Sequence, residues 1–186
     1  MDAFSYLSVL LSIILGLAIA QVLQGYRALL LARGRIHGDP APLIWSGLVL
    51  LFVAQAWWAS FGLNARTNWD FLDFAAILLQ MGLLYMLSAL VLPDVPAGEP
   101  VDLARHFDRH RKSFFAFLIA MLASSIGKEA VLEHRLTAPI NLAFHLLLAA
   151  IAVAGTIFSA KKIQLALALF AVAGFLAYVA LLFAHL

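Results

Sequence analysis

Four ionisable residues within long apolar stretches are the strongest candidates for chemistry in this sequence: Asp73, Lys128, Glu129 and His145. An ionised side chain inside a bilayer costs about 3 kcal/mol or more unless it is paired, so such residues mark functional candidates. Glu129 and His145 lie nine residues before and seven residues after Ala138, which places them at comparable depth. We expect them to form a proton-responsive pair in a polar vestibule, because histidine titrates near neutral pH.

A structural alternative accounts for the same four residues without any transport. In it, Lys128 extends to the membrane interface, Asp73 caps a helix, and Glu129 bonds His145 only to satisfy both groups. The two interpretations differ in whether the side chains line a space that water can reach.

Four glutamines add neutral amides to these apolar stretches. Gln55 lies twelve residues before Thr67 and Gln80 thirteen residues after it, so both reach the same depth on either side of a short turn. A hydrogen bond between them is expected to contribute about 1 kcal/mol. Gln21 and Gln24 lie in the first apolar stretch. The transport hypothesis places all four amides along one path, and the alternative assigns them to helix packing.

Motifs for catalysis, metals and cofactors are not found. The sequence has no Gly-x-Ser-x-Gly, no His-Glu-x-x-His and no paired aspartate motif, and it has no cysteine, which excludes thiol chemistry and Cys-ligated metals. His106 and His110 are one helical turn apart, but a third zinc ligand cannot be assigned and arginines flank both. We predict no catalytic residue, no metal site and no cofactor, and a membrane enzyme is a distant third hypothesis.

The composition is that of an integral membrane protein. Hydrophobic residues make up 65% of the 186 and charged residues 12%, with a mean hydropathy of +0.99. Soluble domains are roughly half apolar and about a quarter charged. A net charge of +2 is too small to indicate a nucleic-acid partner, so the expected partner is the lipid bilayer.

Hydropathy predicts an all-α, six-span helical bundle in a single domain, because each span needs about 20 residues. Pro93, Pro96 and Pro100 belong to a cytoplasmic linker over residues 93–109 that separates two halves of three spans. Inverted halves are common in transporters, but no matching motifs support a repeat here. The spans are expected at residues 4–30, 42–63, 71–92, 110–132, 138–159 and 162–185.

Basic residues predict an N-out, C-out orientation. Nine of them flank the first, third and fifth loops, against three on the other side, and cytoplasmic loops carry the excess of Lys and Arg. The first span resembles a signal peptide, but Asp2 precedes it without a basic residue, so we expect a retained helix. The nine are Arg27, Arg33, Arg35, Arg105, Arg109, Arg111, Lys112, Lys161 and Lys162; the three are Arg66, Lys128 and Arg135.

Small residues recur at every fourth position in the first span and lie along one face of the last span. Ser8, Ser12 and Gly16 belong to such a ridge, along which other helices can approach closely, so we expect the first span to organise the bundle. A second ridge includes Ala173 and Ala177. Two such ridges provide more small-residue surface for helix contacts than one compact bundle needs to bury. We therefore predict a homo-oligomer.

Several short strings resemble a group of small bacterial multi-span integral membrane proteins that carry no assigned activity. The strings are Phe4 to Leu7, Ser12 to Leu17, Trp57 to Ala59, Leu84 to Pro93 and Asp102 to Phe115. This resemblance implies a multi-pass protein of the bacterial inner membrane, and it supplies no site residues.

Two functional hypotheses follow. The first is a channel or carrier for a small ion or solute with an outward-facing polar vestibule; the alternative is a non-transporting sensor or scaffold subunit that binds a lipid or a membrane partner. The first predicts that the polar residues converge on a water-accessible cavity, whereas the alternative predicts a dry interior with mutually satisfied amides.

Overall fold

The computed structural model describes residues 3–66, 68–95, 100–133 and 137–183, and this part of the chain is almost entirely helical. It contains six helices that are each long and apolar enough to cross a membrane, which confirms the all-α class and the six candidate spans. The elements are α1 (Ala3–Leu31), η1 (Arg33–Arg35), β1 (Ile36–His37), α2 (Pro40–Ser60), η2 (Phe61–Ala65), α3 (Phe71–Leu90), β2 (Val101–Asp102), α4 (Leu103–Glu133), α5 (Pro139–Ile157) and α6 (Lys161–Phe183).

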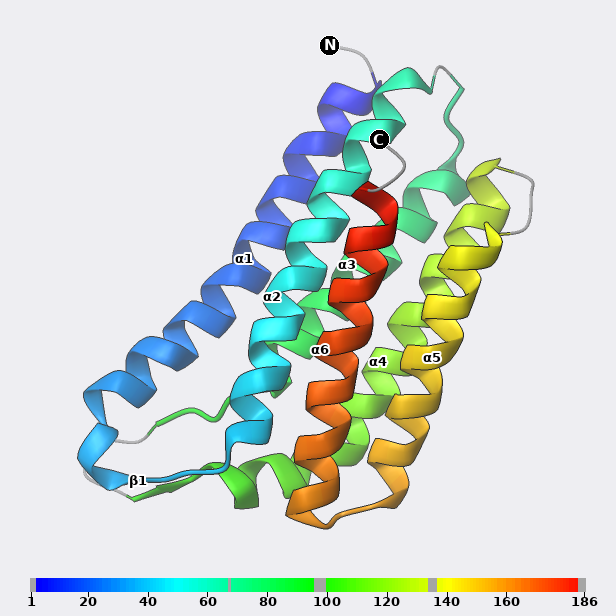
Figure 1. The fold of residues 1–186 in the computed structure, drawn as a ribbon. Helices are drawn as coiled ribbons and strands as arrows, with labels where there is room; N and C mark the ends of the chain where they lie inside the picture. The colour runs from blue at the N-terminus through cyan, green and yellow to red at the C-terminus, as the bar shows by residue number, and fades with distance from the viewer. Residues whose placement is uncertain (1–2, 67, 96–99, 134–136, 184–186) are drawn as a thin grey trace.

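The six helices form a closed ring in the order α1, α2, α6, α5, α4, α3, in which each helix packs against its two neighbours (Figure 1). Helix α2 also contacts α3 and α4 across the ring. The start of α1 and the end of α6 lie at the same end of the bundle, which we call the terminal end. The opposite end, where β1 pairs with β2, is called the strand end.

Aspartates begin two of the helices. Asp39 caps α2 by accepting a hydrogen bond from the Ala41 backbone N–H at 3.0 Å, and Pro40 occupies the first helical position, where its missing N–H is not needed. Asp70 and Asp73 form a reciprocal capping box at the start of α3. These caps place Asp39 at the strand end and Asp73 at the terminal end.

Helix α4 begins at Leu103, inside the stretch that the sequence assigned to a linker. The Asp102 carboxylate accepts a hydrogen bond from the Arg105 backbone N–H at 3.0 Å and thereby supports the first turn. With 31 residues, the helix is roughly 46 Å long, against about 30 Å for the hydrocarbon core of a bilayer. Its first turns therefore extend beyond the hydrocarbon region and carry charged residues.

The short strands β1 and β2 pair in parallel, with Ile36 opposite Val101 and His37 opposite Asp102. The pair joins the α1–α2 connection to the α3–α4 connection at one end of the bundle (Figure 1). The first and third loops therefore lie on the same side, as the alternating topology of six spans requires.

The expectation that α1 organises the bundle is wrong. Helix α1 lies at one side of the ring and buries Leu11, Leu15 and Ala18 against α2 and α3. Ser12 and Gly16 of its small-residue ridge are exposed on the outer surface. In a bilayer, helices associate through van der Waals packing, and on α1 the large side chains rather than the small-residue ridge make these contacts.

The centre of the bundle is an apolar and aromatic layer. The Trp45 ring packs edge-to-face against Phe114 and Phe115, with centroid separations of 5.6 and 5.3 Å. Gly155 of α5 lies against the Phe115 ring so closely that an added Cβ would overlap it. The glycine thus allows α5 to approach α4.

Candidate functional site: a polar cavity at the terminal end

A polar cavity of about 200 Å³ lies within the ring, toward the terminal end. It is lined by residues of α2, α3, α4, α5 and α6. On the same measure, a single water needs about 10–15 Å³, so there is room for several waters or a small solute. Its polar lining consists of Gln55, Gln80, Ser125, Lys128, Glu129, Asn141, His145 and Tyr178.

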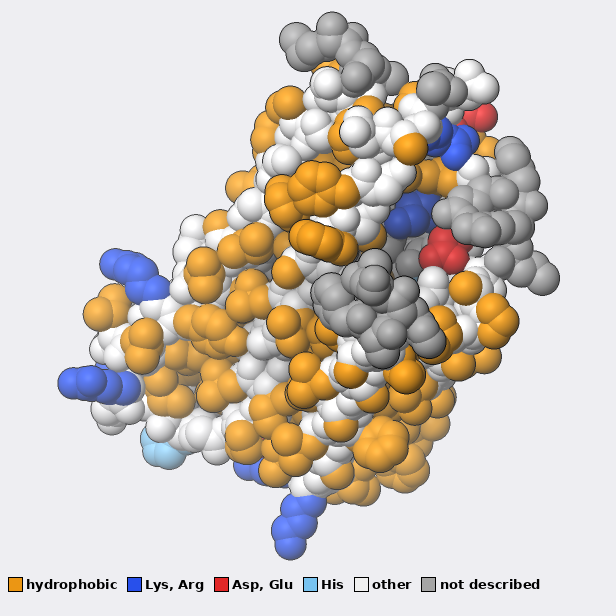
Figure 2. Space-filling model, turned by 45° about the horizontal axis from the view of Figure 1, so that its top comes forward, with side chains coloured by type: hydrophobic (Ala, Val, Ile, Leu, Met, Phe, Trp, Pro, Cys, Tyr) orange, Lys and Arg blue, Asp and Glu red, His pale blue; other side chains and the backbone are white. Residues whose placement is uncertain are grey.

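Five of the eight site residues expected from the sequence line this cavity. They are Gln55, Gln80, Lys128, Glu129 and His145, which come from four different helices. Figure 2 shows basic and acidic side chains together in a hollow at the terminal end, within a surface that is otherwise mostly hydrophobic. These five residues therefore converge on one space, whereas the other three expected residues lie elsewhere.

Gln80 holds an unpartnered acceptor in the cavity wall. Its side chain is only 7% exposed, and its Oε1 atom has no hydrogen-bond donor among the described residues. The expected bond between Gln55 and Gln80 does not form within this part of the chain. A buried carbonyl oxygen without a donor costs about 1–3 kcal/mol, so the cavity contains a group that gains from a bound donor.

His145 presents a hydrogen-bond acceptor to the cavity when it is neutral. Its Nδ1 lies 2.7 Å from the Asn141 carbonyl oxygen, and because a carbonyl can only accept, Nδ1 carries the proton. The neutral ring then leaves Nε2 without a proton. In the described residues, no ion pair joins His145 to Glu129, so the expected pair is replaced by two separate groups lining one space.

Tyr178 is a site residue that sequence reasoning missed. Its hydroxyl donates to Asn141 Oδ1 at 3.1 Å, and Gln55 lines the same cavity. The ring stacks on Phe144 with 4.3 Å between centroids and 6° between planes. The tyrosine lies in an apolar span with no polar neighbour in the sequence. The one signal that could have marked it as a site residue is its hydroxyl, because a buried hydroxyl needs a hydrogen-bond partner.

Apolar side chains close the cavity on the side of the strand end. Phe52, Leu84, Leu122 and Leu148 lie about one turn deeper than the polar lining residues of the same helices. The layer around Trp45 follows, seven residues or about 10 Å deeper along α2. In this conformation, the bundle interior is occluded between the cavity and the strand end.

Asp73, expected in the vestibule, does not line this cavity. It pairs with Arg66 at 2.7 Å and accepts from the Asp70 backbone N–H at 3.3 Å. Arg66 also donates to the Leu132 carbonyl and to the Asn68 carbonyl. The structure therefore assigns Asp73 the capping role that the sequence left as an alternative, because its helix-starting position brings it to Arg66 rather than into the ring.

Gln21 and Gln24 also lie away from the cavity. They line a separate pocket of about 290 Å³ toward the strand end, together with Arg27 and Asp94. The Gln21 amide donates to the Tyr85 hydroxyl at 3.2 Å. The single path through four glutamines therefore does not form, since Gln21 and Gln24 belong to α1, which does not line the terminal-end cavity.

The arrangement suits the binding of a small polar molecule. The cavity contains an anionic group in Glu129, a cationic group in Lys128 and several neutral acceptors. In the described ranges, no three His, Cys, Asp or Glu side chains are grouped to hold a metal ion.

Comparison with known proteins finds no matching family, no matching curated protein and no matching solved structure.

Proposed function

We propose that the protein is a carrier that binds a small polar solute in the terminal-end cavity. The observation that carries this proposal is the unpartnered Gln80 Oε1 in the cavity wall. A stable bundle that needed no ligand would gain about 1–3 kcal/mol by replacing this amide with an apolar side chain. The amide is understandable if a solute donates to it for part of a transport cycle.

The occluding apolar layer favours a carrier over an open channel. The polar lining is separated from the strand end by Phe52, Leu122 and Leu148. A solute that enters the cavity therefore has no open path to the strand end in this conformation. In many carriers, the site lies within the bundle and the helices move to expose it to either side in turn. The proposed cycle therefore requires the helices around this layer to separate.

The proposed setting is the bacterial inner membrane, with both termini and the cavity facing outward. The basic residues that the sequence assigned to the cytoplasm lie on the connections and helix ends at the strand end, where β1 joins two loops. Excess Lys and Arg on one side is typical of the cytoplasmic side.

We also propose a homo-oligomer. The small-residue ridges are exposed on the outside of the ring, including Ser12 and Gly16 on α1 and Ala173 and Ala177 on α6. Faces of small residues allow close helix contacts between copies in a bilayer.

A lipid-binding sensor or scaffold subunit is the second candidate. An apolar groove of about 430 Å³ between α1 and α2 favours it, because its lining includes Leu15, Ile19 and Trp57, which suit an acyl chain. In this alternative, the terminal-end cavity holds only water.

The test is flux through purified protein in liposomes. Proton, potassium, sodium and chloride movement is followed with a pH-sensitive dye and a potential-sensitive dye, and glycerol and glycine uptake by stopped-flow light scattering. The variants are Glu129→Gln and His145→Ala, with Gln24→Ala as the control outside the cavity. A carrier gives flux of at least one probe, which the two cavity variants reduce at least tenfold and the control leaves unchanged.

Two results would contradict the proposal. Flux that both cavity variants leave intact would place the path elsewhere. Failure of all six probes to cross, in protein that is folded by circular dichroism, would favour the sensor or scaffold candidate.

A further inference from the structure

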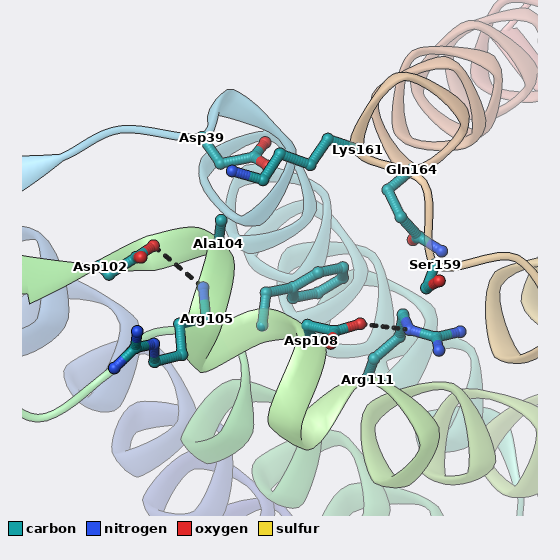
Figure 3. A pocket seen from close by; sticks show the side chains of 10 residues that line it. Asp39, Asp102, Ala104, Arg105, Asp108, Arg111, Ser159, Lys161 and Gln164 are labelled. Carbon is teal, nitrogen blue, oxygen red and sulfur yellow. Dashed lines mark hydrogen bonds and ion pairs between the residues drawn. The ribbon is translucent and has the colours of Figure 1, made fainter.

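A second cavity, of about 310 Å³, lies at the strand end and shares no residue with the first. Its wall combines the residue before α2, the strand β2, the first turns of α4, the α5–α6 turn and the start of α6 (Figure 3). The residues that matter are Asp39, Asp102, Phe107, Asp108, Lys161 and Gln164.

The amide of Gln164 has a fixed orientation. Its Nε2 donates to the Gly155 carbonyl at 3.0 Å and also to the Phe158 carbonyl, and only the NH₂ group can do so. The Oε1 atom is therefore held on the other side, where Figure 3 shows it turned toward the cavity. The residue is 3% exposed, and in the described part of the chain this oxygen has no donor.

Two carboxylates supply further acceptors, whereas the third in the lining, Asp108, is paired with Arg111. Asp39 is 8% exposed and accepts from the Ala41 N–H, and Asp102 accepts from the Arg105 N–H. That hydrogen bond keeps the pKa of Asp102 below its ordinary value, so this carboxylate is ionised at neutral pH. Within the described ranges, neither aspartate takes part in an ion pair.

The one buried cation of the cavity is already engaged. Arg111 Nη1 donates to the carbonyls of Gly155, Thr156 and Phe158 at 2.6, 2.7 and 3.3 Å, and its Nε donates to Asp108 at 3.3 Å. Its positive charge is thus directed at the carbonyl end of α5, where the helix dipole is negative. Lys161 and Arg105 are exposed, as are Asp102 and Asp108, so solvent screens all four charges. The buried acceptors of the cavity are therefore Gln164 Oε1 and the Asp39 carboxylate, and Asp102 adds a carboxylate at the exposed rim.

We propose that the strand-end cavity binds a primary organic ammonium ion. Its N–H groups donate to Gln164 Oε1 and to the carboxylates of Asp39 and Asp102, and its carbon atoms lie against the buried ring of Phe107. A cation near an aromatic ring also gains from the ring's negative face. The ammonium group comes either from a free amine or from the headgroup of an ethanolamine phospholipid. This site does not depend on transport through the terminal-end cavity.

The test is calorimetric titration of the full chain in phosphatidylcholine nanodiscs, which contain no primary ammonium. Ethanolamine is the probe, and tetramethylammonium, which has no N–H group, is the comparison. Saturable binding of ethanolamine, at least tenfold tighter than that of tetramethylammonium, is expected. Equal affinities, no ethanolamine binding, or saturable binding of inorganic phosphate that ethanolamine does not displace would overturn the proposal.

Conservative variants locate the site. Asp39→Asn and Asp102→Asn remove a charge but keep the capping oxygen, since Asn caps helices as well as Asp. Each is expected to weaken ethanolamine binding about 10-fold, as loss of one charge-assisted hydrogen bond predicts. Asp70→Asn, at the cap of α3 outside the cavity, is the matched control. Unchanged affinity in both cavity variants, with unchanged unfolding temperatures, would contradict the assignment.

The two sources of the ammonium group are then separated by adding phosphatidylethanolamine to the nanodiscs. Apparent affinity for free ethanolamine that falls as the lipid fraction rises indicates that the headgroup occupies the site. Affinity that stays constant indicates a free amine.

Discussion

Replacing Gln80 by methionine tests whether the terminal-end cavity is maintained for a ligand at the expense of stability. Methionine has nearly the same length and is unbranched, so it fills the same space without the amide. The side chain is 7% exposed, and its Oε1 has no donor among the described residues. Gln80→Met therefore removes an unsatisfied group rather than a hydrogen bond of that oxygen.

The expected effect is an increase in the free energy of unfolding. A buried acceptor without a partner costs about 1–3 kcal/mol, and removing it should return about 1–2 kcal/mol after small losses in packing. This corresponds to roughly a 5- to 30-fold rise in the ratio of folded to unfolded protein. Solute flux should fall at the same time, because the variant lacks the acceptor that the proposed substrate uses.

The assay is reversible unfolding by sodium dodecyl sulfate in mixed micelles, followed by tryptophan fluorescence and circular dichroism. Gln21→Met is the matched control, because that amide donates to Tyr85 at 3.2 Å. Losing a satisfied hydrogen bond should lower stability by about 0.5–1.5 kcal/mol, so the two identical substitutions have opposite signs. A Gln80→Met protein that is less stable than the wild type, with unchanged flux, would refute the reasoning.

Three further substitutions test the packing that holds the two cavities. Gly155→Ala places a Cβ against the Phe115 ring and should lower the free energy of unfolding by about 1–3 kcal/mol in the same micelle assay. Arg111→Met removes the donors to three carbonyls at the end of α5 and should cost about 3 kcal/mol, seen as a lower unfolding temperature. Asp73→Asn breaks the 2.7 Å ion pair with Arg66 and should cost about 1–3 kcal/mol, again measured by detergent unfolding.

Each of these has a control in the same chain. Gly82→Ala introduces a methyl group where nothing lies within 4 Å, and it should be neutral or slightly stabilising because alanine favours helix. Lys112→Met alters an exposed neighbour of Arg111, and Asp70→Asn retains a helix cap. Effects of the test variants that do not exceed those of their controls would show that these contacts contribute little.

Depth along the membrane could be predicted from the sequence. Helices rise by a constant amount per residue and the connecting turns are short, so counting from a turn gives the height of each side chain. This counting placed Gln55 level with Gln80 and Glu129 level with His145, and all four line one cavity. The count of six spans followed from hydropathy for the same reason, because the bilayer fixes the length of an apolar stretch.

Orientation around each helix axis could not be predicted in this way. Whether a residue faces the ring, its neighbour or the lipid depends on how six helices pack, and nearly every face of these helices is apolar. The depth of Gln24 can be counted from the sequence, but its helix, α1, does not line the terminal-end cavity. Ser12 of the same helix faces outward. Tyr178 escaped notice because its partner Asn141 comes from another helix.

The pairing of Ile36 with Val101 and of His37 with Asp102 also bears on how the chain enters the membrane. Between these two strands the chain crosses the bundle twice, through α2 and α3. If either helix failed to insert, the strands would be left on opposite faces of the bilayer, about 30 Å apart, and could not meet. The pair can form only after Asp102 has been synthesised, and it cannot form in a molecule in which one of α2 and α3 has failed to insert. Because the sequence contains no cysteine, a cysteine pair introduced at Ile36 and Val101 would report this defect, since it would not crosslink in molecules that lack one of these two crossings.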